Sequence, residues 1–120
     1  MRVDVHGWQV HGSMPHVGAN AHRAAAHVVV RVDEALHDAF PASDPRFDPP
    51  ASTFEPTKRL ANVPNINTIP GEERLWFDCR VLPRYPLEDV LRVAREAAAG
   101  VEPSVALDSE ASFPPPACDP

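Results

Sequence analysis

The chain has 120 residues, which is enough for one small domain with a modest core, and 43% of them are hydrophobic, as in a folded globule. Its net charge of −6 argues against nucleic acid as a partner, because phosphate binding requires clustered Lys and Arg. No apolar run approaches the roughly 20 residues that cross a bilayer, so no membrane partner is expected.

The first part of the chain predicts a strand, a loop and a long helix. Residues 2–10 alternate, with Val3 and Val5 on one side. Residues 12–18 are rich in Gly, Ser and Pro and predict a loop. Asn20 is a good N-cap, and the helix should run to about Ala39. Its apolar stripe is predicted to consist of Ala25, Val28, Val32, Ala35 or Leu36, and Ala39.

A second strand is expected over residues 52–60, after a stretch from 41 to 51 that its prolines keep irregular. Pro56 lies inside this strand and removes one donor from the hydrogen-bond ladder. The strand should therefore lie at a sheet edge. An unprotected edge strand invites pairing with another chain.

The third strand, residues 74–82, has the clearest alternation. Leu75, Phe77, Cys79 and Val81 should face the core, and Trp76, Asp78 and Arg80 should face the other side. A second helix should start at Pro86 and end at Gly100, which is placed as its C′ residue. Its buried face should consist of Val90, Leu91, Ala94 and Ala97 or Ala98. Val105 and Leu107 predict a short fourth strand.

This order predicts the α+β class and a ferredoxin-like β-α-β-β-α-β sandwich, with a four-stranded antiparallel sheet and two helices on one face. The strand order of that arrangement, 4-1-3-2, puts the second strand at an edge, as Pro56 independently requires. The domain is expected to cover residues 1–112. Residues 113–120 are interpreted as a connector to a catalytic domain outside this chain.

His11 is the first candidate functional residue, because it ends a strand-like run and enters a loop, where binding and catalytic groups concentrate. No neighbour in the sequence completes an active site around it, so its partners should lie elsewhere. Six histidines fall within the first 37 residues, but their spacing matches no known ligand set, and no carboxylate or cysteine stands with them at ligand spacing. We therefore expect no metal or other cofactor to be bound by this chain.

Two further clusters allow two interpretations each. Residues 62–72 hold Asn62, Asn65 and Asn67, which suit turns but also offer more amide hydrogen-bonding capacity than a turn requires. Arg80 follows Asp78 on the outward face of a strand and either forms a weak surface pair or presents a guanidinium fork to a carboxylate.

The two cysteines, Cys79 and Cys118, are too few for a disulfide framework, and Cys79 is predicted to lie in the core. The N-terminal residues lack the pattern of a signal peptide. Both observations predict a cytoplasmic protein.

Four motifs in order resemble one known family. They are Gly7-x-x-x-His11-Gly12-Ser13-x-Pro15-x-x-Gly18-x-Asn20-Ala21, Ser52-Thr53-Phe54-Glu55, Asn65-x-Asn67-Thr68-Ile69-Pro70-Gly71-Glu72 and Phe77-Asp78-x-Arg80-x-Leu82-Pro83. Together they resemble the lid or dimerisation domain of zinc-dependent amidohydrolases. That group includes succinyl-diaminopimelate desuccinylase, acetylornithine deacetylase, glutamate carboxypeptidase and aminoacylase. The resemblance spans residues 1–118, and the family's lid domain is also ferredoxin-like.

The resemblance implies a specific role. Two zinc ions and a general-base glutamate belong to a separate catalytic domain that cleaves an amide bond in a small N-acyl amino acid or peptide. Two lids form a homodimer through strand 52–60 and helix 20–39. The residue matching His11 stabilises the oxyanion in the partner subunit's active site. Asn67, Arg80 and Gly71 match substrate-binding positions, with Arg80 as a carboxylate clamp.

The His-x-Asp metal motif of the catalytic domain is absent from this sequence, so this chain alone is expected to be inactive. One alternative is a stand-alone ferredoxin-like module that binds a small regulatory molecule, which the setting of His11 and Arg80 disfavours. A nucleic-acid-binding module on the same fold is disfavoured by the acidic charge. Flanking sequence with an upstream His-x-Asp motif would discriminate among these functions.

Overall fold

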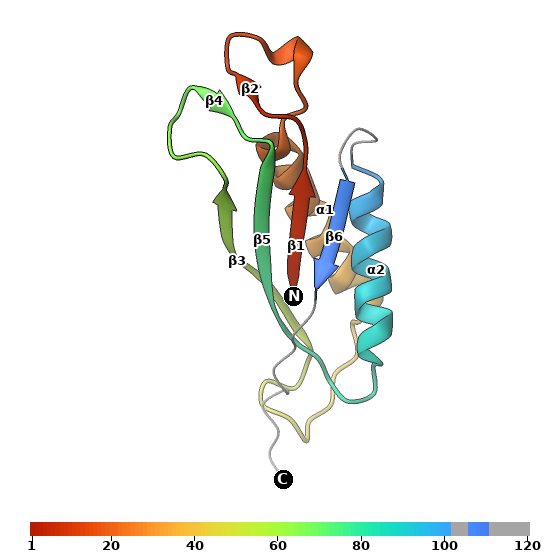
Figure 1. Ribbon diagram of the computed structural model, residues 1–120. Helices are drawn as coiled ribbons and strands as arrows, with labels where there is room; N and C mark the ends of the chain where they lie inside the picture. The colour runs from red at the N-terminus through yellow and green to blue at the C-terminus, as the bar shows by residue number, and fades with distance from the viewer. Residues whose placement is uncertain (102–105, 111–120) are drawn as a thin grey trace.

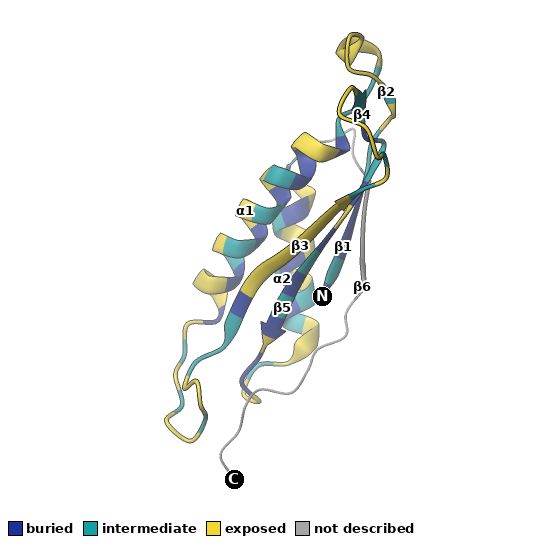
Figure 2. Cartoon of the chain, turned by 90° about the vertical axis from the view of Figure 1, so that its left-hand side faces the viewer, coloured by how far each residue is buried: buried dark blue, intermediate teal, exposed yellow. Residues whose placement is uncertain are grey.

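The computed structural model describes residues 1–101 and 106–110. One antiparallel sheet contains the strands β1 (Arg2–His6), β3 (Thr53–Ala61), β5 (Glu72–Arg80) and β6 (Ala106–Glu110), in the order β3-β5-β1-β6. The helices α1 (Ala21–Ala39) and α2 (Leu87–Ala99) cover one face of this sheet (Figures 1 and 2). The predicted α+β class with two helices and antiparallel strands is confirmed.

Helix α1 begins where the sequence predicts. The side chain of Asn20 accepts a hydrogen bond of 3.1 Å from the backbone N–H of Arg23, which satisfies one of the free donors of the first turn. The expected stripe is buried at Ala25, Val28, Val32 and Leu36. Ala39 is exposed, contrary to expectation, and Phe40 takes the buried place beyond the helix end. The 3.6-residue period reaches a position between Ala39 and Phe40, and the larger side chain fills the core.

Helix α2 has Pro86 as its N-cap residue and Gly100 as its C-cap. Val90, Ala94 and Ala98 are buried, as predicted, while Leu91 and Ala97 are half-buried at the edge of the same core. The core therefore forms between the inner face of the sheet and one stripe on each helix.

Strand β5 has the predicted alternation. Leu75, Phe77 and Cys79 are buried against the helices, and Trp76 and Asp78 lie on the other face. The strand begins two residues before the predicted start, with Glu72 and Glu73. Glu73 therefore continues the inward-facing row, and this charged residue is 1% exposed.

The expected first strand, residues 2–10, is divided in two. Strand β1 ends at His6, and Gly7 donates a hydrogen bond of 2.7 Å to the carbonyl of Gly71. A Cβ atom at Gly7 would lie 2.2 Å from the carbonyl oxygen of Ala19, so only glycine fits where the chain leaves the sheet. The alternation places Asp4 on the open face, yet it is 8% exposed because Arg2 and Arg74 pair with it there.

A second, two-stranded sheet follows this division. It pairs β2 (Val10–His11), at the end of the expected first strand, with β4 (Thr68–Ile69), in a segment where the sequence predicts only a loop. A short 3-10 helix, η1 (Pro15–Val17), follows β2 in the chain. Residues 7–19 and 62–71, here called the projection, extend beyond one end of the main sheet (Figure 1).

Strand β3 lies at the edge of the main sheet, as Pro56 predicts, and most of its residues are exposed (Figure 2). A register shift between Pro56 and Lys58 makes Thr57 an extra residue in the ladder, a β-bulge. The backbone of the fourth strand covers residues 106–110 and includes Leu107. Val105, the domain boundary at 112 and the connector 113–120 lie outside the described residues.

Candidate functional site

His11 lies on the projection, at the end of β2, and is exposed. The backbone N–H of Ser13 donates to its Nδ1 at 3.1 Å, and the hydroxyl of Ser13 is 2.8 Å from the same atom. Because Nδ1 accepts a hydrogen bond, the proton of the neutral ring belongs on Nε2. The local backbone therefore presents His11 as an N–H donor.

Asn67 lies beside His11. Its carbonyl accepts a hydrogen bond of 2.8 Å from the N–H of Gly12, and the pairing of β2 with β4 places Thr68 opposite His11. The Oδ1 atom of Asn67 accepts a hydrogen bond of 2.8 Å from the Asn65 amide. The structure thus brings two of the predicted site residues together at one tip.

Gly71 lies at the base of the projection. Its carbonyl accepts the hydrogen bond from Gly7, and a Cβ atom at Gly71 would lie 2.9 Å from the nitrogen of Gln9. The described contacts give Gly71 a packing role at this base. Substrate binding by Gly71 stays a prediction.

Arg80 lies at the far end of β5 from the projection. The eight residue steps from Glu72 to Arg80 span roughly 26 Å of extended strand. The Nε atom of Arg80 is 3.2 Å from Asp78 Oδ1, and its side chain is 46% exposed. Within one chain, Arg80 therefore does not meet His11 and Asn67.

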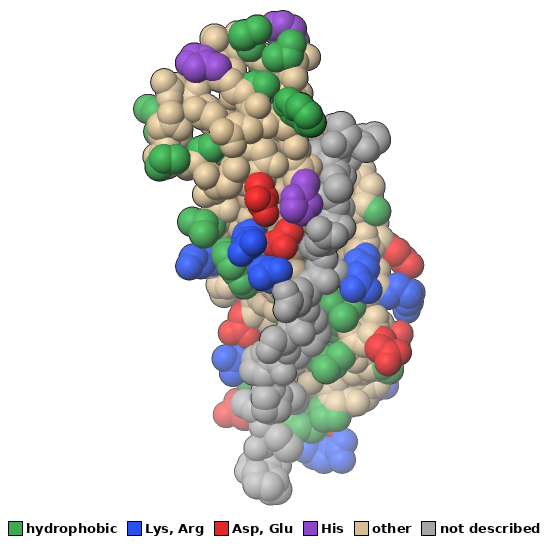
Figure 3. Space-filling view, viewed as in Figure 1, with side chains coloured by type: hydrophobic (Ala, Val, Ile, Leu, Met, Phe, Trp, Pro, Cys, Tyr) green, Lys and Arg blue, Asp and Glu red, His purple; other side chains and the backbone are tan. Residues whose placement is uncertain are grey.

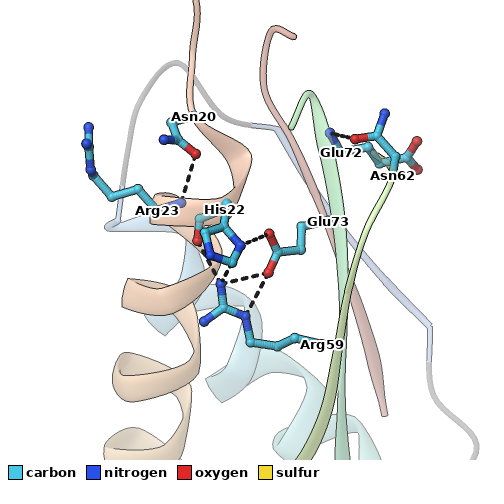
Figure 4. Close-up of polar contacts among 7 residues, drawn as sticks. All are labelled: Asn20, His22, Arg23, Arg59, Asn62, Glu72 and Glu73. Atoms are coloured by element: carbon cyan, nitrogen blue, oxygen red, sulfur yellow. Dashed lines mark hydrogen bonds and ion pairs between the residues drawn. The ribbon is translucent and has the colours of Figure 1, made fainter. Parts of the chain in front are cut away.

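A polar cluster around one buried carboxylate, near the projection, is not predicted by the sequence patterns. Glu73 contacts His22 of α1 and Arg59 of β3 (Figure 4). The alternation of side chains along β5 could have indicated that Glu73 is buried, because Glu73 lies two residues before Leu75 and faces the same way. The contribution of α1 could not be found in this way, because His22 is far away in the sequence.

The projecting end also carries exposed apolar side chains. Figure 3 shows hydrophobic and histidine side chains gathered over this end of the molecule. The residues are Trp8, Met14, Val17 and Ile66, all of them largely exposed. A tip with this composition is suited to contact another protein surface.

A hollow of about 420 Å³ lies between the projection and the start of α1, and Arg23 is the one ionisable side chain among its lining residues. No three His, Cys, Asp or Glu side chains gather as a metal site within residues 1–101. In the same part of the chain, no helix is long and apolar enough to cross a membrane.

Two groups outside this region have shifted pKa values. Burial raises the pKa of the Cys79 thiol to about 11, so this cysteine is neither a nucleophile nor a ready thiolate ligand. Hydrogen bonds from Arg46 lower the pKa of Asp44 to about 2. Neither group lies on the projection.

The amino-acid sequence matches a family model and individual known proteins. The model of the peptidase dimerisation domain family matches residues 1–105. An uncharacterized metallohydrolase of Methanococcus maripaludis is 41% identical over 91 residues, which are 76% of this chain and 22% of the relative. A second uncharacterized metallohydrolase, from Methanocaldococcus jannaschii, has the same identity and coverage. The chain thus spans about a fifth of the length of the curated relatives it matches.

Solved structures match the fold. A hydantoinase/carbamoylase family amidase from Burkholderia multivorans has a TM-score of 0.68 at 19% identity, over 98% of this chain and 28% of the amidase. An aminobenzoyl-glutamate utilization protein from Klebsiella pneumoniae has a TM-score of 0.60 at 21% identity, over 89% of this chain and 25% of that protein. Each of these proteins is about three to four times as long as the segment that this chain matches.

Proposed function

The chain belongs to the peptidase dimerisation domain family, and on that premise we propose that it is the lid and pairing domain of a zinc-dependent metallohydrolase. The proposed reaction is cleavage of the amide bond of a small N-acyl amino acid or peptide. The relatives are metallohydrolases by description, and the resemblance of the four motifs supports the substrate class. We also propose that the main sheet is ferredoxin-like and that the enzyme is cytoplasmic, where the free Cys79 stays reduced.

The observation that carries this proposal is the setting of His11. It is an exposed N–H donor on the tip, with its ring oriented by Ser13, and no three His, Cys, Asp or Glu side chains within residues 1–101 gather as a metal site. Such a donor is useful where negative charge develops on a carbonyl oxygen during acyl transfer. His11 therefore serves an active site built elsewhere. Zinc does not fit the described residues of this domain, so none of them is assigned to it.

A two-fold pairing of β3 edges supports a site shared between subunits. In an antiparallel pair centred on the middle of β3, the Thr53 end of one copy lies beside the Ala61 end of the other. Arg80 is opposite Thr53, and Glu73 is opposite Ala61. Arg80 is then three strand spacings, or roughly 14 Å, from the partner's Glu73. The distance from Arg80 to Glu73 of its own subunit, along β5, is roughly 23 Å. Arg80 of one subunit and His11 of its partner thus converge on the same side.

The test is His11→Ala in the intact dimeric enzyme. We expect kcat to fall on the order of 10²-fold with little change in KM, because an oxyanion donor acts mainly in the transition state. His16→Ala is the matched control, since His16 is another exposed histidine of the same tip and should leave kcat unchanged.

Hybrid dimers test the action across subunits. Subunits carrying His11→Ala are mixed with subunits that lack a zinc ligand in the catalytic domain. The intact metal site then receives His11 from its neighbour, so each hybrid dimer has one working site and should show about half the activity of a normal dimer. Inactive hybrids, with subunit exchange demonstrated and both parents folded, would refute the role in trans.

A further inference from the structure

Glu73 is a carboxylate enclosed by two partners on different elements. Its side chain is 1% exposed, and each of its oxygens lies against a separate nitrogen (Figure 4). His22 Nδ1 is 2.6 Å from Oε2, and Arg59 Nε donates to Oε1 at 2.7 Å. The guanidinium of Arg59 also donates to the backbone carbonyl of His22 at 2.8 Å. Burial of a charge is costly unless it is paired in this way, so these contacts are mutually dependent.

The tautomer of His22 follows from this geometry. Arg59 Nη2 lies 3.2 Å from His22 Nδ1, but a guanidinium only donates, whereas the Glu73 carboxylate only accepts. The shorter contact to Glu73 assigns a proton to Nδ1. His22 is then held by the carboxylate, while Arg59 holds the carbonyl of the same residue.

The cluster lies where the chain enters the projection. Four segments lead into it: the end of β1, the start of α1, the end of β3 and the start of β5. His22, Arg59 and Glu73 lie on the last three of these. Nearby, the N–H of Ala21 donates to the carbonyl of Pro70 at 3.1 Å. One carboxylate therefore ties together three of the four segments that set the direction of the projection.

We propose that His22, Arg59 and Glu73 are positioning residues that hold the projection at the angle at which His11 reaches the partner's active site. The inference rests on the proposed function of His11. Arg59 belongs to the edge strand β3, so the cluster also fixes the projection relative to the proposed subunit contact. A small misplacement of a catalytic group lowers the rate steeply, whereas substrate binding by other groups is retained.

Glu73→Gln and His22→Ala in the intact dimeric enzyme test the proposal. Glutamine has nearly the same shape but turns a donor toward His22 or Arg59, and His22→Ala removes one partner from a largely exposed helix position. With the best substrate from a panel of N-acetyl and N-succinyl amino acids, we expect kcat to fall about tenfold or more for Glu73→Gln. We expect a smaller fall for His22→Ala. KM should stay within about twofold for both.

Hydrogen–deuterium exchange of the same dimers provides a readout independent of activity. Exchange should accelerate in residues 8–19 and 62–70 and stay unchanged in β1 and α2. The matched control is Arg92→Gln, which breaks the ion pairs with Asp89 and Glu96 on α2, away from the projection and from the proposed subunit contact. It should change neither kcat nor exchange in the projection.

Two results would overturn the positioning role. One is a normal kcat in both single variants, His22→Ala and Glu73→Gln, when each is folded and dimeric. The other is accelerated exchange over the whole domain, which would show a general loss of stability. If His11→Ala has normal kcat, the proposed function fails instead, and local exchange in the projection still decides whether the cluster orients it.

Discussion

At the residue scale, the inner face of β5 carries two ionisable groups, Glu73 and Cys79, among hydrocarbon side chains. Glu73 has strong donors on both oxygens, so burial is compatible with its charge. Cys79 has only a weak contact of 3.9 Å from its Sγ to the carbonyl of Phe77. Burial of this thiol is compatible with the neutral form alone.

The raised pKa of Cys79 predicts a loss of stability at alkaline pH. The folded pKa is about 11 and the ordinary value is 9.0, so the unfolded chain loses this proton first as pH rises. The contribution is fully present below pH 9 and is lost as pH rises toward 11, up to about 2–3 kcal/mol in the free energy of unfolding. Urea unfolding of wild type and Cys79→Ala between pH 8 and about 11 measures it. Parallel pH dependence in both proteins would contradict the assignment.

At the element scale, β3 and α1 form the proposed subunit contact. Strand β3 has one paired side, and Val30 is a 55% exposed apolar residue on α1. Pro56 and the bulge at Thr57 limit how long a second ladder on this edge can be. Helix packing must therefore supply part of the association free energy.

Val30→Asp should weaken the dimer. The change removes apolar area and buries a carboxylate twice in a two-fold contact, so we expect roughly a 10²-fold increase in the dissociation constant of the dimer. Sedimentation velocity over a range of concentrations of the intact enzyme measures this. Leu87→Asp is the control, because Leu87 is a 45% exposed apolar residue on α2, outside the proposed contact. Equal effects of the two changes would exclude α1 from the interface.

The elements also show what sequence patterns can predict. Asn20, the stripe of α1 and the alternation of β5 follow from local patterns, and they are confirmed except at Ala39, which is exposed. The β2–β4 sheet was missed because each strand has two residues, too few for any period to be visible. The cluster around Glu73 was missed because it joins segments that only the tertiary fold brings together. The roles of His11, Asn67, Gly71 and Arg80 stay predictions.

At the scale of the whole molecule, the two ends of the main sheet have different chemistry. The projection with His11 and Asn67 extends from one end, and Arg80 lies at the other. A two-fold pairing reverses one sheet relative to its partner, so opposite ends of two subunits meet. The proposed pairing would allow residues far apart in one chain to serve one substrate.

Arg80→Ala should therefore act selectively in the intact enzyme. We expect a loss of roughly 2–3 kcal/mol in transition-state binding for substrates with a carboxylate, because the contact is charge-assisted. Matching amides of the same substrates should lose little in kcat/KM. Arg46→Ala is the control, since Arg46 is an exposed arginine that also pairs with a nearby aspartate, Asp44, outside the proposed substrate contact. Equal losses for acids and amides would refute the clamp role.

The bulge at Thr57 determines which side chains in the second half of β3 face the helices and which face the open side of the sheet. Side chains of a strand alternate between faces, and one extra residue exchanges the two faces beyond it. With the bulge, Leu60 lies opposite Arg74 on the open face and is 54% exposed, while Arg59 points toward Glu73. Without it, Leu60 would turn inward and Arg59 would point into solvent. The bulge thus leaves Leu60 exposed, and in the same register it turns Arg59 toward the buried carboxylate of Glu73.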